Sequence, residues 1–441
     1  MDPTIIIIGA GTLGTSTAVH LAHSYSDPSR IALIDPDPDL AAARDVNRII
    51  RTDYPSKLYC DLANEALHAW FWDLRLQRFF HKTGWLVLDE EGVGRGESVR
   101  RVFRERGFDR TEDVAVGDAG SRWEGLRGSE FGRFQRAYFN PEVGWVNAKQ
   151  ATGAFLDDAL KRGIRRVKGR VAELVWSEEM GKVEGVRLQD GRIFTADKIV
   201  LAAGAWTSGL LSPIEDRLAI AERDRLERQA RATAVVSVYY KLAPEEVHRL
   251  ANPDNMPIVV YGKQGEVIPP SVNQPLLKYN LSGLKITNSV ATGSGRTISS
   301  PTIPGRDQYD VPTYIKEQFE ADMISKLLPE YVRGRKPDHY RICWDSCTST
   351  EDLLMCKHPH EKLDNLFIAA GGSFAGYKFL PNAGTYMVNV IHGKSNGSEK
   401  DRAFGWKSQP DLDAAAKGWI QCREWRDLQD DETSSVPLAR L

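Results

Sequence analysis

The 441-residue sequence lacks a charge imbalance, long apolar runs and a regular set of cysteines. Lys and Arg number 58 against 60 Asp and Glu, so no overall charge attracts the chain to nucleic acid or an anionic membrane. The five cysteines are odd in number and unevenly spread, unlike a secreted disulfide framework. The start, Met1-Asp2-Pro3-Thr4, has no basic region, and the apolar run Ile5 to Ile8 meets glycine at once. We therefore expect neither a signal peptide nor a membrane span, and a reducing, aqueous compartment.

The first 35 residues carry a βαβ pattern. The uninterrupted apolar run Thr4 to Ile8 predicts a strand buried on both faces of a parallel sheet. A glycine turn, Gly9 to Gly14, follows directly, and Ser16 to Ala22 predicts a helix. A second predicted strand, Arg30 to Ile34, ends at Asp35. Strand, glycine turn, helix, strand and acidic residue in this order are typical of a dinucleotide-binding fold.

The glycine turn predicts a phosphate-binding site at the start of the helix. The first glycine permits a tight turn, the second lets the backbone approach a pyrophosphate, and the third lets the helix pack against the strand. The helix N-terminus then supplies amide donors, and the acidic residue accepts hydrogen bonds from a ribose. The alternative is a purely structural glycine turn with an acidic residue in a loop. The predicted cofactor contacts are Gly9, Gly11, Thr12, Leu13, Gly14 and Asp35.

Two further strand-to-glycine junctions, Lys198 to Trp206 and Leu366 to Ser373, indicate that separated pieces of chain form one nucleotide-binding domain. The intervening pieces have alternating and aromatic patterns, as in Thr233 to Tyr240 and Pro257 to Tyr261. The predicted fold class is α/β plus antiparallel β, with a Rossmann-like domain and a sheet-rich substrate domain. The predicted boundaries are 1–75, 146–214 and 336–395 for the first domain, 76–145 and 215–335 for the second, and 396–441 for a charged tail that we expect to wrap over the surface.

Four segments besides the βαβ unit repeat the order of motifs in a known family. They are Asp45-Val-Asn-Arg-Ile-Ile-Arg51, Ala202-Ala-Gly-Ala-Trp206, Arg341-Ile-Cys-Trp-Asp345 followed by His358-Pro359, and Gly371-Gly-Ser-Phe-Ala-Gly-Tyr-Lys-Phe379. Together, over nearly the whole length, these segments resemble FAD-dependent amine oxidases of the D-amino-acid-oxidase superfamily. The group within it contains monomeric sarcosine oxidase, pipecolate and saccharopine oxidases and the fructosyl-amino-acid oxidases (amadoriases). The resemblance implies FAD as the cofactor and a monomer.

The resemblance implies roles for five cationic or nucleophilic residues. Cys343 would bond covalently to the flavin, and Arg48 would lie over the flavin ring. Lys285 would assist the reaction of reduced flavin with oxygen, and Arg51 and Lys378 would hold the substrate carboxylate. The alternatives from the residues alone are a buried structural cysteine, a solvated lysine and a basic surface turn. Cys347 follows Cys343 by four residues, but no second ligand pair is nearby, so we expect no metal site.

Three positions near the implied site depart from the relatives. The amadoriases carry an acidic residue and the sarcosine oxidases a histidine where this chain has Ser289. Phe374 and Tyr377 stand where the relatives have smaller or different residues. Asp345 follows the amadoriase pattern, and its carboxylate would bind a substrate ammonium or cap a turn. The substrate contacts implied are Arg51, Lys378, Asp345, Ser289 and Tyr377, and the remaining cofactor contacts are Asn47, Arg48, Val171, Ala203, Gly204, Trp206, Cys343, Gly372, Phe374, Gly376, Tyr377 and Lys378.

The function implied is oxidation of a secondary amine in an N-alkylated amino acid, of the N-methyl, saccharopine or pipecolate type. The products would be an imine, hydrolysed to carbonyl and amine, and hydrogen peroxide. The alternatives are a fructosyl-amino-acid oxidase, an NAD(P)-dependent dehydrogenase and a non-catalytic nucleotide-binding protein. The last three residues, Ala439-Arg440-Leu441, form a small-basic-leucine tripeptide of the kind that a peroxisomal import receptor reads, so we expect a peroxisomal or otherwise cytoplasmic protein.

Overall fold

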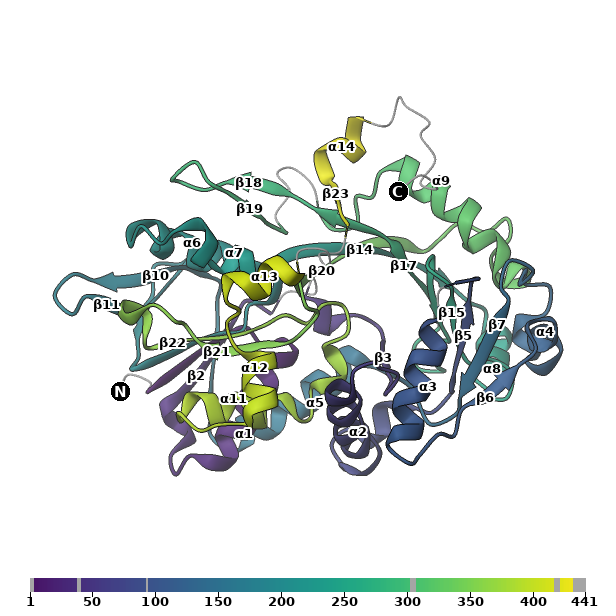
Figure 1. The fold of residues 1–441 in the computed structure, drawn as a ribbon, viewed down its shortest axis with the longest axis horizontal. Helices are drawn as coiled ribbons and strands as arrows, with labels where there is room; N and C mark the ends of the chain where they lie inside the picture. The colour runs from purple at the N-terminus through teal and green to yellow at the C-terminus, as the bar shows by residue number, and fades with distance from the viewer. Residues whose placement is uncertain (1–3, 38–40, 93, 302–306, 416–420, 431–441) are drawn as a thin grey trace.

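Two large β-sheets organise the chain, as the ribbon in Figure 1 shows. The computed structural model describes residues 4–37, 41–92, 94–301, 307–415 and 421–430. One sheet lies toward the left of the view with its helices, and the other crosses the top and turns down on the right. The predicted fold class, a Rossmann-like α/β unit with a sheet-rich partner, is confirmed.

The first sheet has six strands in the order β21–β22–β13–β1–β2–β9. All neighbours are parallel except β21 and β22, which pair antiparallel. The sheet therefore gathers strands from both ends and the middle of the chain, as the glycine junctions predicted. Its strands are β1 (Ile5–Ile8), β2 (Ile31–Asp35), β9 (Arg165–Lys168), β13 (Lys198–Leu201), β21 (Leu354–Lys357) and β22 (Leu366–Ala370).

Strand β1 is apolar throughout because both of its faces are covered. Ile5 and Ile7 pack in a core with helices α1 (Thr12–Ser24), α5 (Ala148–Lys161) and α11 (Ala383–Ile391). Ile6 and Ile8 pack in a second core on the opposite face. That core contains helix α6 (Thr207–Arg217) and a small sheet of β10 (Val171–Ser177), β11 (Lys182–Leu188) and β12 (Ile193–Thr195).

The second sheet has the order β20–β14–β17–β16–β15–β5–β7–β6, with β23 paired to β17. One face carries the largest core, which is covered by helices including α8 (Pro244–Leu250) and α9 (Thr313–Asp322). The other face turns Trp85 and Val260 toward the cavity described below. The strands are β5 (Trp85–Asp89), β6 (Glu112–Val114), β7 (Arg136–Asn140), β14 (Ala230–Lys241), β15 (Ile258–Tyr261), β16 (Gly265–Ile268), β17 (Leu276–Thr287), β20 (His339–Thr348) and β23 (Arg423–Glu424).

Sheet membership differs from the predicted domain limits at two places. Strand β20 lies in the piece 336–395 that was assigned to the nucleotide-binding domain, yet it pairs along its whole length with β14 of the second sheet. A three-stranded sheet of β3 (Arg48–Ile50), β8 (Gly144–Val146) and β4 (Phe80–His81) joins pieces that were assigned to different domains. Strand pairing between residues far apart in sequence, which single-strand patterns do not encode, decides both placements.

The described part of the tail packs against the body rather than only lying over it. Trp425 is 2% exposed in the largest core, and β23 extends β17 by parallel pairing at Ile286 and Thr287. Trp406 is half-buried, whereas Trp419 and Ala439-Arg440-Leu441 lie outside the described residues. The remaining elements are α2 (Lys57–Trp72), α3 (Arg95–Glu105), α4 (Ala119–Arg122), α7 (Leu226–Gln229), α10 (Pro329–Val332), α12 (Ser398–Phe404), α13 (Gln409–Ala415), α14 (Trp425–Asp430), β18 (Ser289–Ala291) and β19 (Thr297–Ser299).

Candidate active site

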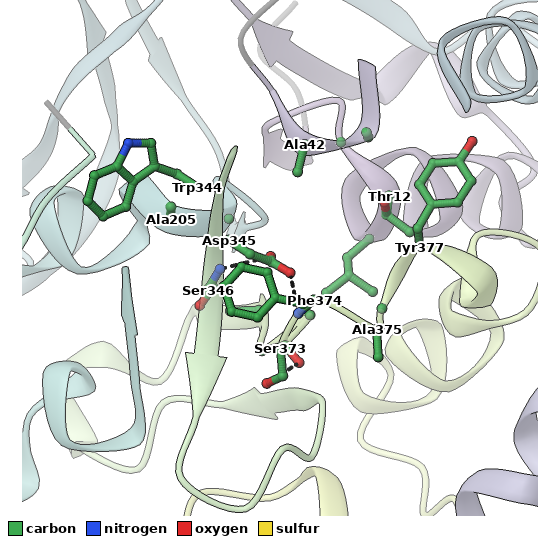
Figure 2. A pocket seen from close by; sticks show the side chains of 18 of the residues that line it. Thr12, Ala42, Ala205, Trp344, Asp345, Ser346, Ser373, Phe374, Ala375 and Tyr377 are labelled. Carbon is green, nitrogen blue, oxygen red and sulfur yellow. Dashed lines mark hydrogen bonds between the residues drawn. The ribbon is translucent and has the colours of Figure 1, made fainter. Parts of the chain in front are cut away.

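A cavity of about 1190 Å³ lies between the two sheets. Its lining runs from the glycine turn after β1 to the cavity-facing side of the second sheet. Figure 2 shows part of this lining, in which Thr12 and Tyr377 approach from the first sheet's side and Trp344 and Asp345 from β20. The cavity is therefore long enough to combine a nucleotide-binding end with a chemically different end.

The glycine turn forms a cradle in which every glycine has a different constraint. Gly9 has φ +103°, and a Cβ there would lie 2.4 Å from the carbonyl oxygen of Ala202. A Cβ on Gly14 would lie 1.9 Å from the carbonyl oxygen of Gly9, so this glycine serves helix packing and does not line the cavity. At Gly11 a Cβ would meet nothing within 4 Å. Because Gly11 lines the cavity, its backbone is open to the approach of a pyrophosphate.

The groups at the nucleotide end suit an adenosine diphosphate. No side chain caps the N-terminus of α1 at Gly11, so its first amides are left for an anion, and Thr12 and Leu13 line the cavity beside them. Asp35 ends β2 and accepts hydrogen bonds from the amides of Ala10 and Asp37 at 2.8 and 2.7 Å. These bonds fix the carboxylate and leave further lone pairs for ribose hydroxyls.

The loop after β22 is held in an unusual backbone conformation by Asp345. Ser373 and Phe374 have φ values of 47° and 60°, in the left-handed region that non-glycine residues avoid. The Asp345 carboxylate accepts hydrogen bonds from the amides of Ser346 and Phe374 at 2.8 and 2.7 Å (Figure 2). Burial raises the pKa of Asp345. Of the two sequence interpretations, the turn-capping role is the one that these contacts support.

Tyr377 presents its ring but not its hydroxyl to the cavity. The hydroxyl bonds to the carbonyl oxygen of Ala148 at 2.7 Å and to the Thr152 hydroxyl at 2.9 Å, both in α5. The ring stacks on Trp70 with the centroids 6.1 Å apart. Tyr377 therefore contributes an apolar wall, and its hydrogen-bonding capacity is used within the protein.

Arg51 and Lys378 form a cationic pair around Tyr54. The Arg51 guanidinium lies 4.5 Å from the Tyr54 ring centroid and donates to the carbonyl oxygen of Asp53. The Lys378 ammonium donates to the Tyr54 hydroxyl at 2.8 Å and to the carbonyl oxygen of Ala375. Burial, followed by the charge of Arg51, lowers the pKa of Lys378 well below its ordinary value. An anion bound between the two cations would relieve this repulsion.

Arg48 connects Cys343 to a buried carboxylate. Its guanidinium donates to Cys343 Sγ at 3.0 Å and to the carbonyl oxygen of Ala42 at 2.7 Å, and it forms an ion pair with Asp45 at 2.8 Å. Cys343 lies on β20, is 3% exposed and lines the cavity. The hydrogen bond from Arg48 therefore fixes the Cys343 sulfur at the wall of the cavity.

Asp45 is the anionic centre of a buried charge cluster. Besides Arg48, it pairs with Lys278 at 2.6 Å and Arg341 at 3.3 Å, and it accepts a hydrogen bond from the Tyr239 hydroxyl at 2.7 Å. Burial alone would raise the pKa of Asp45, but Lys278 and the two arginines outweigh it and lower the pKa below its usual range. The Asp45 carboxylate therefore stays ionised and fixes the three cations in place.

Lys285 lies in a β-bulge. Leu281 of β17 pairs with Val236 of β14, but two residues further along β14, Ala234 pairs with Ile286, so β17 holds three extra residues between these pairs. Lys285 is one of them; its ammonium lies 4.5 Å from the Phe374 ring centroid and it lines the cavity. Burial lowers the pKa of Lys285, and the carboxylate of Glu266 partly offsets this effect.

The structure brings most of the predicted site residues together around the cavity. Three lie elsewhere. Gly14 packs helix against strand, Asn47 is buried behind the lining, and Ser289 is exposed on β18, where Glu424 accepts hydrogen bonds from its amide and hydroxyl at 3.0 and 2.7 Å. The predicted residues that line the cavity are Gly9, Gly11, Thr12, Leu13, Asp35, Arg48, Arg51, Val171, Ala203, Gly204, Trp206, Lys285, Cys343, Asp345, Gly372, Phe374, Gly376, Tyr377 and Lys378.

Sequence reasoning missed several lining residues. Tyr54 follows Arg51 by three positions, close enough for the motif to have included it. Glu266, on β16, and Arg95, at the start of α3, belong to no motif. They could be found only from the pairing of β16 in the sheet and the packing of α3. Among the described residues there is no His, Cys, Asp and Glu cluster suited to a metal ion, and none of the helices there has the length and apolarity needed to cross a membrane.

Comparison with known proteins agrees with this geometry. The family model described as FAD dependent oxidoreductase matches residues 4–390, so the chain belongs to this family. FAD is therefore the dinucleotide that the cradle serves, and the predicted enzyme class, an FAD-dependent oxidoreductase, is confirmed.

Individual relatives cover almost the whole chain. L-saccharopine oxidase of Schizosaccharomyces pombe is 27% identical over 456 residues, covering 98% of this chain and 99% of the relative. Monomeric sarcosine oxidase of a Bacillus species is 24% identical and covers 88% and 91%. The crystal structure of the deglycating fructosamine oxidase Amadoriase II of Aspergillus fumigatus superposes with a TM-score of 0.80 at 26% identity, covering 97% of this chain and 92% of that one.

Proposed function

We propose that the protein oxidises a secondary amine of an N-alkylated amino acid, using oxygen as the electron acceptor. The observation that carries the proposal is the pair Arg51 and Lys378, two cations that share one end of the cavity without a protein carboxylate bound to either among the described residues. A planar guanidinium with a neighbouring ammonium suits one carboxylate. The names of the sarcosine and saccharopine oxidases agree with such a substrate.

The chain's residues would act mainly by orientation. Arg51 and Lys378 would hold the carboxylate, and the rings of Tyr54, Trp85 and Phe374 would exclude water around the C–N bond. The chemistry that FAD supplies when bound is removal of a hydride equivalent next to the nitrogen and transfer of two electrons to oxygen, giving an imine and hydrogen peroxide. Lys285 would place a positive charge where negative charge develops on oxygen.

The test is a screen of the purified protein for peroxide formation with N-methyl, cyclic and N-carboxyalkyl amino acids, with decarboxylated amines as controls. We expect turnover of the acids and little of the amines. Equal use of the decarboxylated amines would contradict the proposal. Better use of fructosyl-valine than of every N-alkyl amino acid would instead favour the second candidate, a fructosyl-amino-acid oxidase, which the similarity to Amadoriase II supports.

Covalent attachment of FAD at Cys343 is part of the proposal. It is supported by the position of Cys343 in the cavity and by the Arg48 hydrogen bond to its sulfur. Yellow colour should stay with the acid-precipitated protein and be released by Cys343→Ala. Flavin in the supernatant of the wild-type protein would contradict the attachment.

Lys285 is proposed as the oxygen-reaction residue. Lys285→Met should slow reoxidation of reduced flavin far more than it slows reduction by substrate, because a preorganised charge of this kind contributes about 3 kcal/mol. Stopped-flow measurement of the two half-reactions checks this. Equal losses in both would indicate a structural lysine.

We also propose import into peroxisomes through Ala439-Arg440-Leu441. A peroxide-forming oxidase fits that compartment, and two of the relatives are named peroxisomal sarcosine oxidases. A fluorescent protein that carries the last dozen residues should enter peroxisomes. A diffuse signal would count against import.

A further inference from the structure

Arg95 is a cavity-lining cation to which the proposed function assigns no task. It is the first residue of α3 and is exposed at the point where the cavity meets solvent. The other arginines of α3 all have carboxylate partners: Arg100 pairs with Asp113, Arg101 with Glu105 and Arg104 with Glu97. Within the described residues no carboxylate lies within ion-pair distance of Arg95. An arginine directed to a cavity rather than to a nearby carboxylate is available to a ligand.

The charge of Arg95 reaches the groups at the carboxylate end of the cavity. Burial is the main cause of the lowered pKa of Lys378 and of the raised pKa of Glu266. The positive charge of Arg95 lowers the pKa of both groups. Arg95 is therefore near the Arg51 and Lys378 pair but comes from a different element. Lys378 is 3% exposed, whereas Arg95 is exposed and comes from α3, so the two cations lie at different depths of the cavity.

The charge balance of the cavity favours an anionic substrate. Leaving aside the nucleotide end, and Arg48 and Asp345, whose opposite charges cancel in the count, five cationic lining side chains face three carboxylates. One of the carboxylates, Asp352, is shared with Lys407 at 3.4 Å. A protonated N-alkyl amino acid with one carboxylate has no net charge and leaves this surplus of cations unmatched. The cations are Arg51, Arg95, Lys263, Lys285 and Lys378, and the carboxylates are Glu266, Glu351 and Asp352.

We propose that Arg95 forms a second carboxylate-binding site at the opening of the cavity, so that the preferred substrate carries a carboxylate on each side of its secondary nitrogen. This inference rests on the proposed function and narrows it to N-carboxyalkyl amino acids. The first carboxylate binds Arg51 and Lys378. The carboxylate on the other N-substituent then extends toward α3 and binds Arg95.

The experiment compares two matched substrate series with the FAD-loaded enzyme. N-alkylglycines and N-(ω-carboxyalkyl)glycines of equal chain length differ only in the terminal carboxylate. At the best chain length, the carboxylated compound should have a kcat/KM roughly ten- to a hundred-fold higher than its alkyl match, mainly through KM, because one charged hydrogen bond is gained. Arg95→Gln should remove this advantage without changing turnover of the alkyl series, and Arg95→Lys should retain part of it.

Arg101→Gln is the matched control, since Arg101 lies on the same helix and pairs with Glu105. It should leave both series unchanged. Arg95→Gln lowering both series by the same factor, or no carboxylated compound exceeding its alkyl match, would overturn the second site while leaving the proposed function intact. If neither series reduces the flavin, the proposed function fails, and the second site fails with it.

Discussion

The two ends of the cavity are built in different ways. At the nucleotide end, the glycine turn and the carboxylate beside it come from a single stretch, Gly9 to Asp35. The other end, where we propose that the substrate binds, is lined by side chains from four separate elements: Arg51 after β3, Arg95 on α3, Lys285 on β17 and Lys378 after β22. The cradle for FAD, the cofactor of the family, is thus formed by local backbone geometry. The proposed substrate end is instead lined by side chains that can change independently of one another.

The largest expected effect is a loss of stability caused by a substitution in the glycine turn of the nucleotide end. Gly14→Ala should cost more than about 3 kcal/mol of stability, because its Cβ would lie 1.9 Å from the Gly9 carbonyl oxygen. Gly11→Ala is the control, since its Cβ has no neighbour within 4 Å. It should leave the melting temperature of flavin-free protein unchanged and reduce bound flavin. Calorimetry and flavin absorbance separate the two outcomes, and equal melting temperatures for both variants would contradict this account of the turn.

The next effect concerns the charge cluster between the two ends. Asp45→Asn leaves Lys278, Arg48 and Arg341 without their buried counter-ion and should cost about 3–5 kcal/mol. Adding Lys278→Met should restore part of the loss, because it removes one uncompensated charge. Urea unfolding of the single and double variants checks this. Strictly additive losses would show that Asp45 and Lys278 do not act as a pair.

A smaller effect is expected on kcat/KM when a side chain at the proposed substrate end is removed. Arg51→Ala should lower kcat/KM for an N-alkyl amino acid by about ten- to a hundred-fold, since one charged hydrogen bond to the carboxylate is lost. The decarboxylated amine should be unaffected, and bound flavin should remain at the wild-type level. Loss of flavin in Arg51→Ala would mean that the two ends are not separable as described.

The smallest effect is a pH dependence. Lys378 binds an anion only while protonated, and its pKa is lowered by burial and by Arg51. Carboxylate affinity should therefore fall as the pH rises, and it should do so well below about 10.4, where an ordinary lysine titrates. Lys378→Arg stays protonated and should give a flatter KM profile over the same range. Identical profiles for the wild type and Lys378→Arg would assign the titration to another group.

The difference between the two ends also explains what the sequence could reveal. The βαβ unit was predictable because its glycine constraints and apolar strands are local. Cys343, Arg51 and Lys378 were identified through the resemblance, not from their own pattern. Lys278 pairs with Asp45 across 233 positions, and the bulge that holds Lys285 exists only relative to β14. Such pairings depend on sheet register and burial, for which a single sequence carries no local signal.

Strand β23 has a consequence for how the enzyme matures. It pairs with β17 immediately after Lys285, and Glu424 accepts a hydrogen bond from the Thr287 hydroxyl at 2.7 Å, so Arg423 and Glu424 support the region of Lys285. The cradle is synthesised first, yet its sheet is completed only by β22, and the end of β17 next to Lys285 gains its partner β23 later still. During translation, the nascent chain should therefore form the nucleotide-binding sheet before β23 pairs with β17 beside Lys285. A premature stop just before β23 should yield a protein that keeps the nucleotide-binding geometry but lacks the strand pairing beside Lys285.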